Sequence, residues 1–282
     1  MNSISIVLLL LLVLVVISAL GWLASGTRRS YRSEVNHYLS ASEPIRTVVE
    51  EPELKSLPAP VRRYLLRVGV VGQPQARNLR AVWTGRMRRG PESPWFPIWA
   101  EQHNFYGPLV RTFFIRGRML GIPVIGRDLY AEGQGEMVMR PLGLVPVVDL
   151  KGEELAASGL VTIFNDMCLL SPSTLLDSRV SWEPLDDQSA RASLTDHGRT
   201  VAATLSFNED GDLAEFTTED RFMESEGGFV RVPWSTPVSQ YRQIGDQRVP
   251  TYGKGVWHLA DGVFEYAEFH LQSLAINVTD AG

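Results

Sequence analysis

The first stretch of the chain contains no charged side chain. Residues Ile4 to Ala24 are apolar except for Ser5, Ser18 and Gly21. At about 1.5 Å of rise per residue, a helix over this run crosses a hydrocarbon layer about 30 Å thick. We therefore expect residues 1–27 to form a single-pass transmembrane anchor that inserts into the membrane through residues 4–24. A cleavable signal peptide fits less well, because it has a basic start and a shorter apolar core.

Basic residues flank this apolar run on one side only. Arg28, Arg29 and Arg32 follow it, and no Lys or Arg precedes it. The positive-inside rule then favours the cytoplasmic side for the remaining chain. Long domains cross a membrane largely regardless of flanking charge, so the periplasmic or extracellular side stays open.

Helical spacing and proline positions organise the next part of the chain. Residues 28–42 place apolar side chains at helical intervals, which predicts a polar helical stalk. Residues 43–56 contain two prolines and predict a linker with no regular element. Pro60 to Val68 predicts a short amphipathic helix that ends at Gly69.

From Leu79 onward, apolar positions recur every second residue, which indicates strands with one buried face. The cleanest example is residues 200–207, and the turn residues 208–211 that follow predict a hairpin. By the same criteria we predict strands at 79–87, 95–105, 109–118, 128–130, 136–140, 200–207, 213–222, 238–244, 249–252, 255–259 and 264–274.

A helical insert separates the two groups of strands. Glu153 to Phe164 is predicted as a helix, and a second helix is expected to start with Ser171 as its N-cap and Pro172 in its first turn. The apolar segment Leu142 to Val148 is broken by a glycine and a proline, so we expect an irregular segment that covers the sheet.

These elements predict an α+β fold. Short hairpin turns require antiparallel pairing, and a sheet of about nine or ten strands tends to curl. We expect residues 57–282 to form a single domain in which a large curled antiparallel sheet, a half-barrel, packs against a few helices around an apolar interior. The N-terminal transmembrane helix precedes it, with residues 28–56 as stalk and linker.

Several sequence motifs together resemble a bacterial, membrane-anchored family that is known only as a domain of unknown function. The resemblance covers residues 55 to 278 and rests on LPAPVRRYL at 57–65, GQGEM at 133–137, LGLVPVVD at 142–149, FNDMCLL at 164–170, WEPLD at 182–186 and VPWSTPV at 232–238. Such a family implies no activity. Its strand order is similar to that of the periplasmic lipoprotein carriers, which implies a curled sheet with a helical lid around an apolar cavity. A periplasmic carrier and a cytoplasmic domain do not agree, and the sequence leaves that conflict open.

Composition narrows the function classes. The formal net charge of −5 disfavours nucleic acid as the partner, because phosphate binding requires a basic surface. The five histidines and one cysteine do not form a metal-binding motif, and the chain lacks the glycine-rich nucleotide motifs. We predict no metal and no cofactor.

Few polar residues stand out as candidates for a site. Asn165 and Asp166 interrupt an apolar helical face, so they either orient the polar head of a ligand or simply end one helix. Cys168 lies among apolar residues, which indicates a buried structural thiol. Ion pairs are the expected role of the charged residues in sheet segments, which are Asp128, Asp149, Arg127, Asp220 and Arg221.

The leading hypothesis is a membrane-anchored module that binds an apolar or lipid-like ligand inside the curled sheet. Asn165, Asp166 and Trp234 are the predicted ligand-binding residues, and no catalytic residue is predicted. Two alternatives remain: a structural or interaction protein with a membrane partner, and a hydrolase that uses Asp166, Asp149 or Cys168.

Overall fold

The computed structural model describes residues 3–42 and 47–282 and is dominated by one antiparallel sheet. The sheet has 13 strands in the order β6-β5-β4-β3-β2-β1-β15-β14-β13-β10-β9-β8-β7. Its strands are β1 (Asn78–Met87), β2 (Phe96–Phe105), β3 (Val110–Met119), β4 (Ile122–Ala131), β5 (Gln134–Pro141), β6 (Val148–Lys151), β7 (Val180–Pro184), β8 (Ser189–Asp196), β9 (Arg199–Phe207), β10 (Leu213–Thr218), β13 (Trp234–Ile244), β14 (Gln247–Leu259) and β15 (Gly262–Ile276).

Six helical segments and a small hairpin accompany the sheet. The helices are α1 (Ser3–Ala24), α2 (Gly26–Ala41), α3 (Ala59–Val68) and α4 (Glu153–Leu170), with 3₁₀ turns η1 (Glu51–Ser56) and η2 (Pro172–Leu176). Strands β11 (Phe222–Ser225) and β12 (Gly228–Arg231) pair with each other in a separate sheet.

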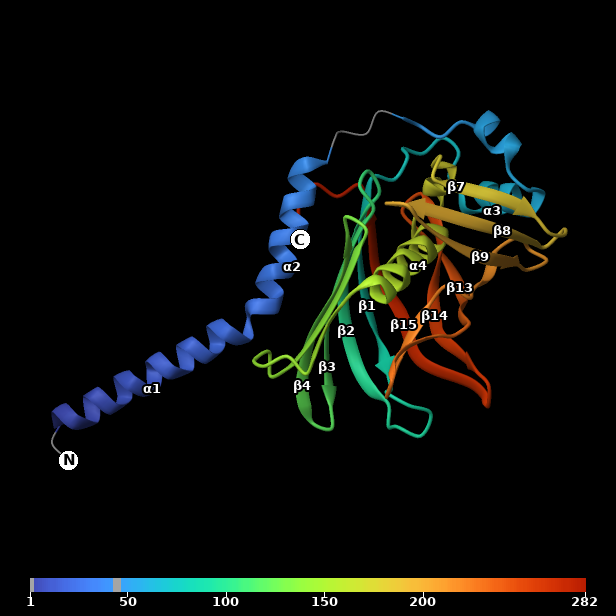
Figure 1. Ribbon diagram of the computed structural model, residues 1–282. Coiled ribbons are helices and arrows are strands. Elements are labelled where there is room, and N and C mark those ends of the chain that lie inside the picture. The colour runs from blue at the N-terminus through green and yellow to red at the C-terminus, as the bar shows by residue number, and fades with distance from the viewer. Residues whose placement is uncertain (1–2, 43–46) are drawn as a thin grey trace.

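The large sheet curls around α4 but does not close, because β6 and β7 form its two free ends (Figure 1). The expected α+β fold with a large antiparallel sheet and a few helices is therefore confirmed. The strand count is higher than predicted. Strands β6, β7 and β8 were missed; β8 buries the small side chains of Ala190 and Ala192, which give only a weak alternating signal.

The hydrophobic core lies between α4 and the inner face of the sheet. In β9 the residues Val201, Ala203, Leu205 and Phe207 are all buried and alternate with partly exposed ones, as predicted. The short helix α3 is also confirmed. It ends at Gly69, whose φ of 79° is the left-handed conformation that favours glycine.

Helix α4 is longer than its sequence pattern indicated. It runs without a break through Asn165 and Asp166, so these residues do not end a helix. The helix is apolar on nearly all sides because it is buried against the sheet, and its amphipathic period is correspondingly weak. The expected second helix from Ser171 is only the 3₁₀ turn η2.

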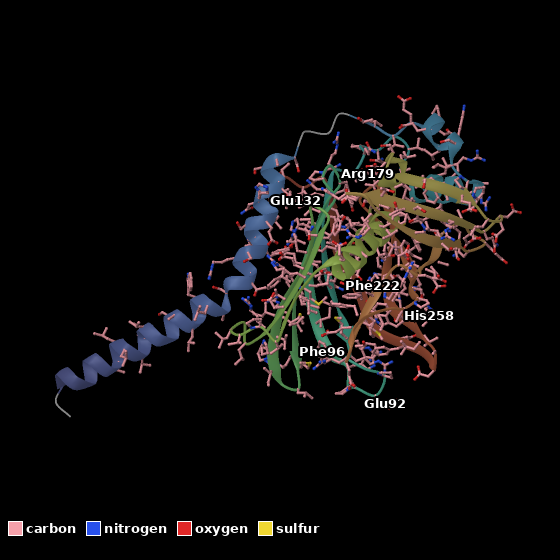
Figure 2. All side chains as sticks on the ribbon, viewed as in Figure 1. Glu92, Phe96, Glu132, Arg179, Phe222 and His258 are labelled. Atoms are coloured by element: carbon pink, nitrogen blue, oxygen red, sulfur yellow. The ribbon has the colours of Figure 1, made fainter. Side chains whose placement is uncertain are left out.

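The N-terminal helices join at a bend. In the described residues no single helix is long and apolar enough to span a membrane, whereas Leu10–Ala24 and Gly26–Ala41 pass that test as a pair bent by 45°. Helix α1 extends away from the β-rich body (Figure 2). Helix α2, the predicted stalk, packs on β3 and β4 through buried Tyr31 and Val35.

Two other predictions concern connecting segments. In the predicted linker 43–56, residues 43–46 lie outside the described part of the chain, and η1 is a regular element that was not expected. Residues 142–147 form an irregular connection between β5 and β6, but they do not cover the sheet, because Leu142, Val145 and Val147 are exposed.

Candidate functional site

A cavity of about 300 Å³ lies between α4 and the inner face of the curled sheet. Its lining residues come from α4 and from strands on both sides of the sheet centre. Most are apolar or aromatic, among them Trp83, Phe96, Ile98, Phe113, Ile115, Val124, Met137, Met139, Leu169, Trp234, Val238, Tyr266 and Phe269. Such a lining suits an apolar ligand, and the volume is at the lower end for small-molecule pockets, roughly 300–1,000 Å³.

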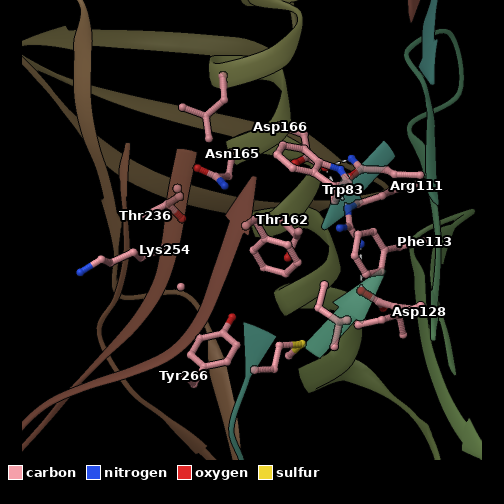
Figure 3. A pocket seen from close by; sticks show the side chains of 18 of the residues that line it. Trp83, Arg111, Phe113, Asp128, Thr162, Asn165, Asp166, Thr236, Lys254 and Tyr266 are labelled. Carbon is pink, nitrogen blue, oxygen red and sulfur yellow. Dashed lines mark hydrogen bonds and ion pairs between the residues drawn. The ribbon is translucent and has the colours of Figure 1, made fainter. Parts of the chain in front are cut away.

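A buried polar cluster around Asp166 forms one wall of this cavity (Figure 3). The Oδ2 atom of Asp166 on α4 accepts hydrogen bonds from Gln102 Nε2 (2.7 Å) and Asn104 Nδ2 (3.1 Å) on β2. It also accepts one from Arg111 Nε (2.8 Å) on β3. Arg111 Nη1 in turn donates to Asp128 Oδ2 on β4 at 2.9 Å. The cluster therefore ties α4 to three strands.

Burial dominates the electrostatics of this cluster. It raises the pKa of Asp166 above the ordinary range, and the charge of Arg111 and the amide donors oppose that rise. Burial alone would lower the pKa of Arg111, but the neighbouring carboxylates of Asp166 and Asp128 raise it. Arg111 thus stays charged, and the pairing with Asp166 offsets part of the cost of burying both groups.

The opposite side of the cavity contains polar atoms that lack partners. Arg221 stacks over the ring of Trp234 with 4.1 Å between its Cζ atom and the ring centroid, and its Nη1 donates to Thr162 Oγ1 at 2.9 Å. Among the described residues, Arg221 Nε, Asn165 Oδ1 and Thr236 Oγ1 have no hydrogen-bond partner. All three residues line the cavity.

The structure brings the three predicted ligand-binding residues to one place. All three line the cavity, namely Asn165, Asp166 and Trp234. The side chain of Asp166 faces the polar residues on β2 and β3, whereas that of Asn165 lies on the side of Thr236 (Figure 3). Their role in binding stays a prediction.

Sequence reasoning missed Gln102, Arg111 and Thr236, and it expected an ion pair for Arg221. Arg221 forms none among the residues described and instead stacks on Trp234. The signal that could have identified these residues is that they are polar and alternate with apolar residues along predicted strands. It does not tell which face of the sheet the helix covers.

The other candidate groups lie elsewhere. Cys168 is fully buried beside Tyr64, whose hydroxyl donates to its carbonyl at 2.7 Å, and burial raises the pKa of the thiol. Asp149 is exposed on the edge strand β6. His103 is buried under α2 and bonds Tyr31. These groups are not assembled with Asp166 in the cavity wall, and the described residues contain no group of ligands that could hold a metal ion.

Comparisons with known proteins give a family but no activity. A family model described as a family of unknown function, DUF6544, matches residues 47–269. No curated protein matches the chain.

Solved structures show distant likenesses. A lipoprotein-sorting protein domain from Vibrio parahaemolyticus has 10% identity and a TM-score of 0.35, covering 71% of this chain and 86% of that one. A LolA superfamily protein from Nitrosomonas europaea has 11% identity and a TM-score of 0.39, covering 77% of this chain and 94% of that one. A DUF1329 family protein from Desulfovibrio piger has 12% identity and a TM-score of 0.41, covering 82% of this chain and 95% of that one. At such scores the likenesses say nothing about ligand or activity.

Proposed function

Because the chain belongs to DUF6544, a family of unknown function, we propose a function from the site itself: a membrane-anchored module that holds an apolar, lipid-like ligand in the cavity beneath α4. The observation that carries this proposal is an apolar cavity of about 300 Å³ beside buried polar atoms that have no partner in the described chain.

The size of the cavity limits the ligand. Its volume of about 300 Å³ is at the lower end of the range for small-molecule pockets. Water is a poor occupant of the part lined by aromatic and aliphatic side chains, because it finds few hydrogen-bond partners in that part. A single apolar chain replaces that water favourably, at about 25 cal/mol per Å² of apolar surface removed from solvent.

The unpartnered polar atoms indicate that the ligand is amphipathic. A buried polar group without a hydrogen bond costs about 1–3 kcal/mol. Three such groups lie on one side of the cavity, and a polar ligand group that bonds them would offset this cost.

Filling the cavity tests this proposal. Thr236 is 8% exposed and lines the cavity, so Thr236→Phe should place a ring in the ligand's space. We expect the full chain, purified in two chemically different detergents, to carry a small amphipathic molecule detectable by mass spectrometry of organic extracts. The Thr236→Phe variant should carry severalfold less of it.

Ser239 provides the matched control. It lies on the same strand with an exposed side chain outside the cavity, so Ser239→Phe adds the same ring without touching the ligand's space. Equal amounts of bound molecule in the Thr236→Phe chain and the natural chain would mean that the ligand does not occupy this cavity.

Helix α1 is our proposed membrane anchor, with the β-rich domain on the cytoplasmic side. Its support is the uncharged apolar run at Ile4–Ala24 and the three arginines that follow. The contact between α1 and the domain adds to it. A Cβ at Gly143 would overlap the backbone of Ala24, so the β5–β6 connection with its exposed apolar side chains touches the end of α1. That connection would lie at the bilayer surface.

Charged residues in α1 should release the protein from membranes. An arginine at the centre of a membrane helix costs roughly 2.5–3.5 kcal/mol, so Leu12→Arg with Leu14→Arg should move most of the full chain out of the carbonate-resistant membrane fraction. The pair Leu12→Ala and Leu14→Ala is the control and should stay. In intact spheroplasts, we expect the domain to be protected from added protease. Digestion of the domain by the added protease would place it on the periplasmic or extracellular side instead.

A further inference from the structure

We propose that the ligand carries an anionic head group, a carboxylate or a phosphate, and that Arg221, Asn165 and Thr236 bind it. This inference rests on the proposed function and specifies the class of ligand.

The first argument is the pairing of the cations around the cavity. Arg111 pairs with Asp166 and Asp128, Arg127 pairs with Glu34 and Glu136, and Lys254 pairs with Glu265. Within the described residues, Arg221 is the cation of the cavity lining without a carboxylate partner. Its neighbour Asp220 pairs with Arg231 instead. The guanidinium of Arg221 therefore lines the cavity without a carboxylate partner in the described residues.

The second argument is that Arg221 is held in a fixed position. Its guanidinium lies over two indole rings, 4.1 Å from the centroid of Trp234 and 5.6 Å from that of Trp257. Thr162 on α4 accepts a hydrogen bond from Nη1, which fixes the rotation of the planar group. Stacking and one hydrogen bond leave Nε with no acceptor in the described chain, and a planar guanidinium in this state is well suited to bind a carboxylate or phosphate.

The third argument is the set of donors beside it. Asn165 and Thr236 are 6% and 8% exposed, and both line the cavity (Figure 3). The Nδ2 amide of Asn165 and the hydroxyl of Thr236 can both donate to an oxygen anion, whereas the unpartnered Oδ1 of Asn165 is an acceptor and does not contribute to anion binding. Asn165 lies one helical turn after Thr162, and Thr236 lies two residues after Trp234 on the same strand face, so both donors share the side of the cavity that contains Arg221. The acidic side chains of the lining, Asp128 and Asp166, both pair with Arg111 on the other wall.

Four probe molecules with the same alkyl chain and different head groups test the inference. The full chain is reconstituted in phosphatidylcholine nanodiscs, and retention of labelled dodecanoate, dodecyl phosphate, dodecanol or dodecyltrimethylammonium is measured against empty nanodiscs. We expect the two anions to bind at least about tenfold more tightly than dodecanol, a difference of about 1.4 kcal/mol. A preference for dodecanoate would indicate a free fatty acid as the source of the anion, and a preference for dodecyl phosphate would indicate a phospholipid head group.

Variants of Arg221 distinguish binding of the ligand's head group from binding of its alkyl chain. Arg221→Met keeps the apolar stem and should weaken both anions about tenfold while dodecanol is unchanged. Arg221→Lys keeps the charge and should retain part of the preference. Arg116 provides the matched control, because it stacks on Trp99 at 4.2 Å but does not line the cavity. We expect Arg116→Met to bind all four probes as the natural chain does.

The outcomes distinguish this inference from the proposed function. Equal binding of dodecanol and dodecanoate by the natural chain would overturn the anionic head while leaving an apolar site in place. Equal losses for all probes in Arg221→Met would do the same, because Arg221 would then support the fold rather than the head group. Retention of none of the probes would overturn the proposed function and the head-group inference together.

Discussion

Replacing Asp166 by alanine should lower the free energy of unfolding by about 3–5 kcal/mol. Asp166 and Arg111 are each 7% exposed, and removal of one member of a buried ion pair leaves the other charge without compensation. The same change removes the acceptor of Gln102 and Asn104. For a domain of this size we expect a fall in melting temperature of roughly 10 °C, measured by thermal unfolding of the full chain in detergent.

Asp128 is the control for this prediction. It pairs with the same guanidinium at 2.9 Å, but its side chain is 33% exposed, so water can replace part of the interaction. Asp128→Ala should therefore cost about 1 kcal/mol or less. A result in which both variants melt alike would show that burial of the Asp166 pair does not govern the attachment of α4 to the sheet.

Gly135→Ala should destabilise the protein by about 3 kcal/mol, the upper end for added volume in a packed interior. A Cβ at Gly135 on β5 would overlap the backbone of Leu155 and Ala156 in the first turns of α4. Backbone atoms cannot rotate away as a side chain can, so the helix must shift from the strand. Thermal unfolding would show the loss, and ligand retention should fall with it because α4 also lines the cavity.

Gly107 provides the matched control for the glycine substitution. A Cβ at this turn position meets nothing within 4 Å. Gly107→Ala is therefore expected to change the melting temperature by no more than about 1 °C, within the range of surface substitutions. If Gly135→Ala proved equally harmless, the close approach of β5 and α4 would not be required for stability.

The structure gives the Gly133-Gln134-Gly135 motif two separate roles. The strands predicted at 128–130 and 136–140 require a turn between them, and Gly133, with its φ of 72°, lies at that turn. Gly135 has a different reason to be glycine, because a distant helix packs directly on it. Local turn chemistry was readable from neighbouring residues, whereas the helix contact joins positions about 20 residues apart by folding.

The candidate site shows the same division. Asn165 and Asp166 were recognisable as polar residues within an apolar segment. Their partners Arg111, Gln102 and Arg221 were not, because arginine and glutamine alternate with apolar residues on many strands and only strand pairing brings a particular one under α4.

The sequence by itself determined the apolar N-terminal run, the antiparallel hairpins and the α+β class, because each follows from periodicity and turn residues within a short window. Only the tertiary structure decided that the sheet has 13 strands, that α4 continues to Leu170, and that Arg221 faces the cavity without a carboxylate partner in the described residues. The reason is physical. Those features depend on which side chains the curled sheet places opposite one buried helix, and contacts between positions far apart in the chain leave no local pattern in it.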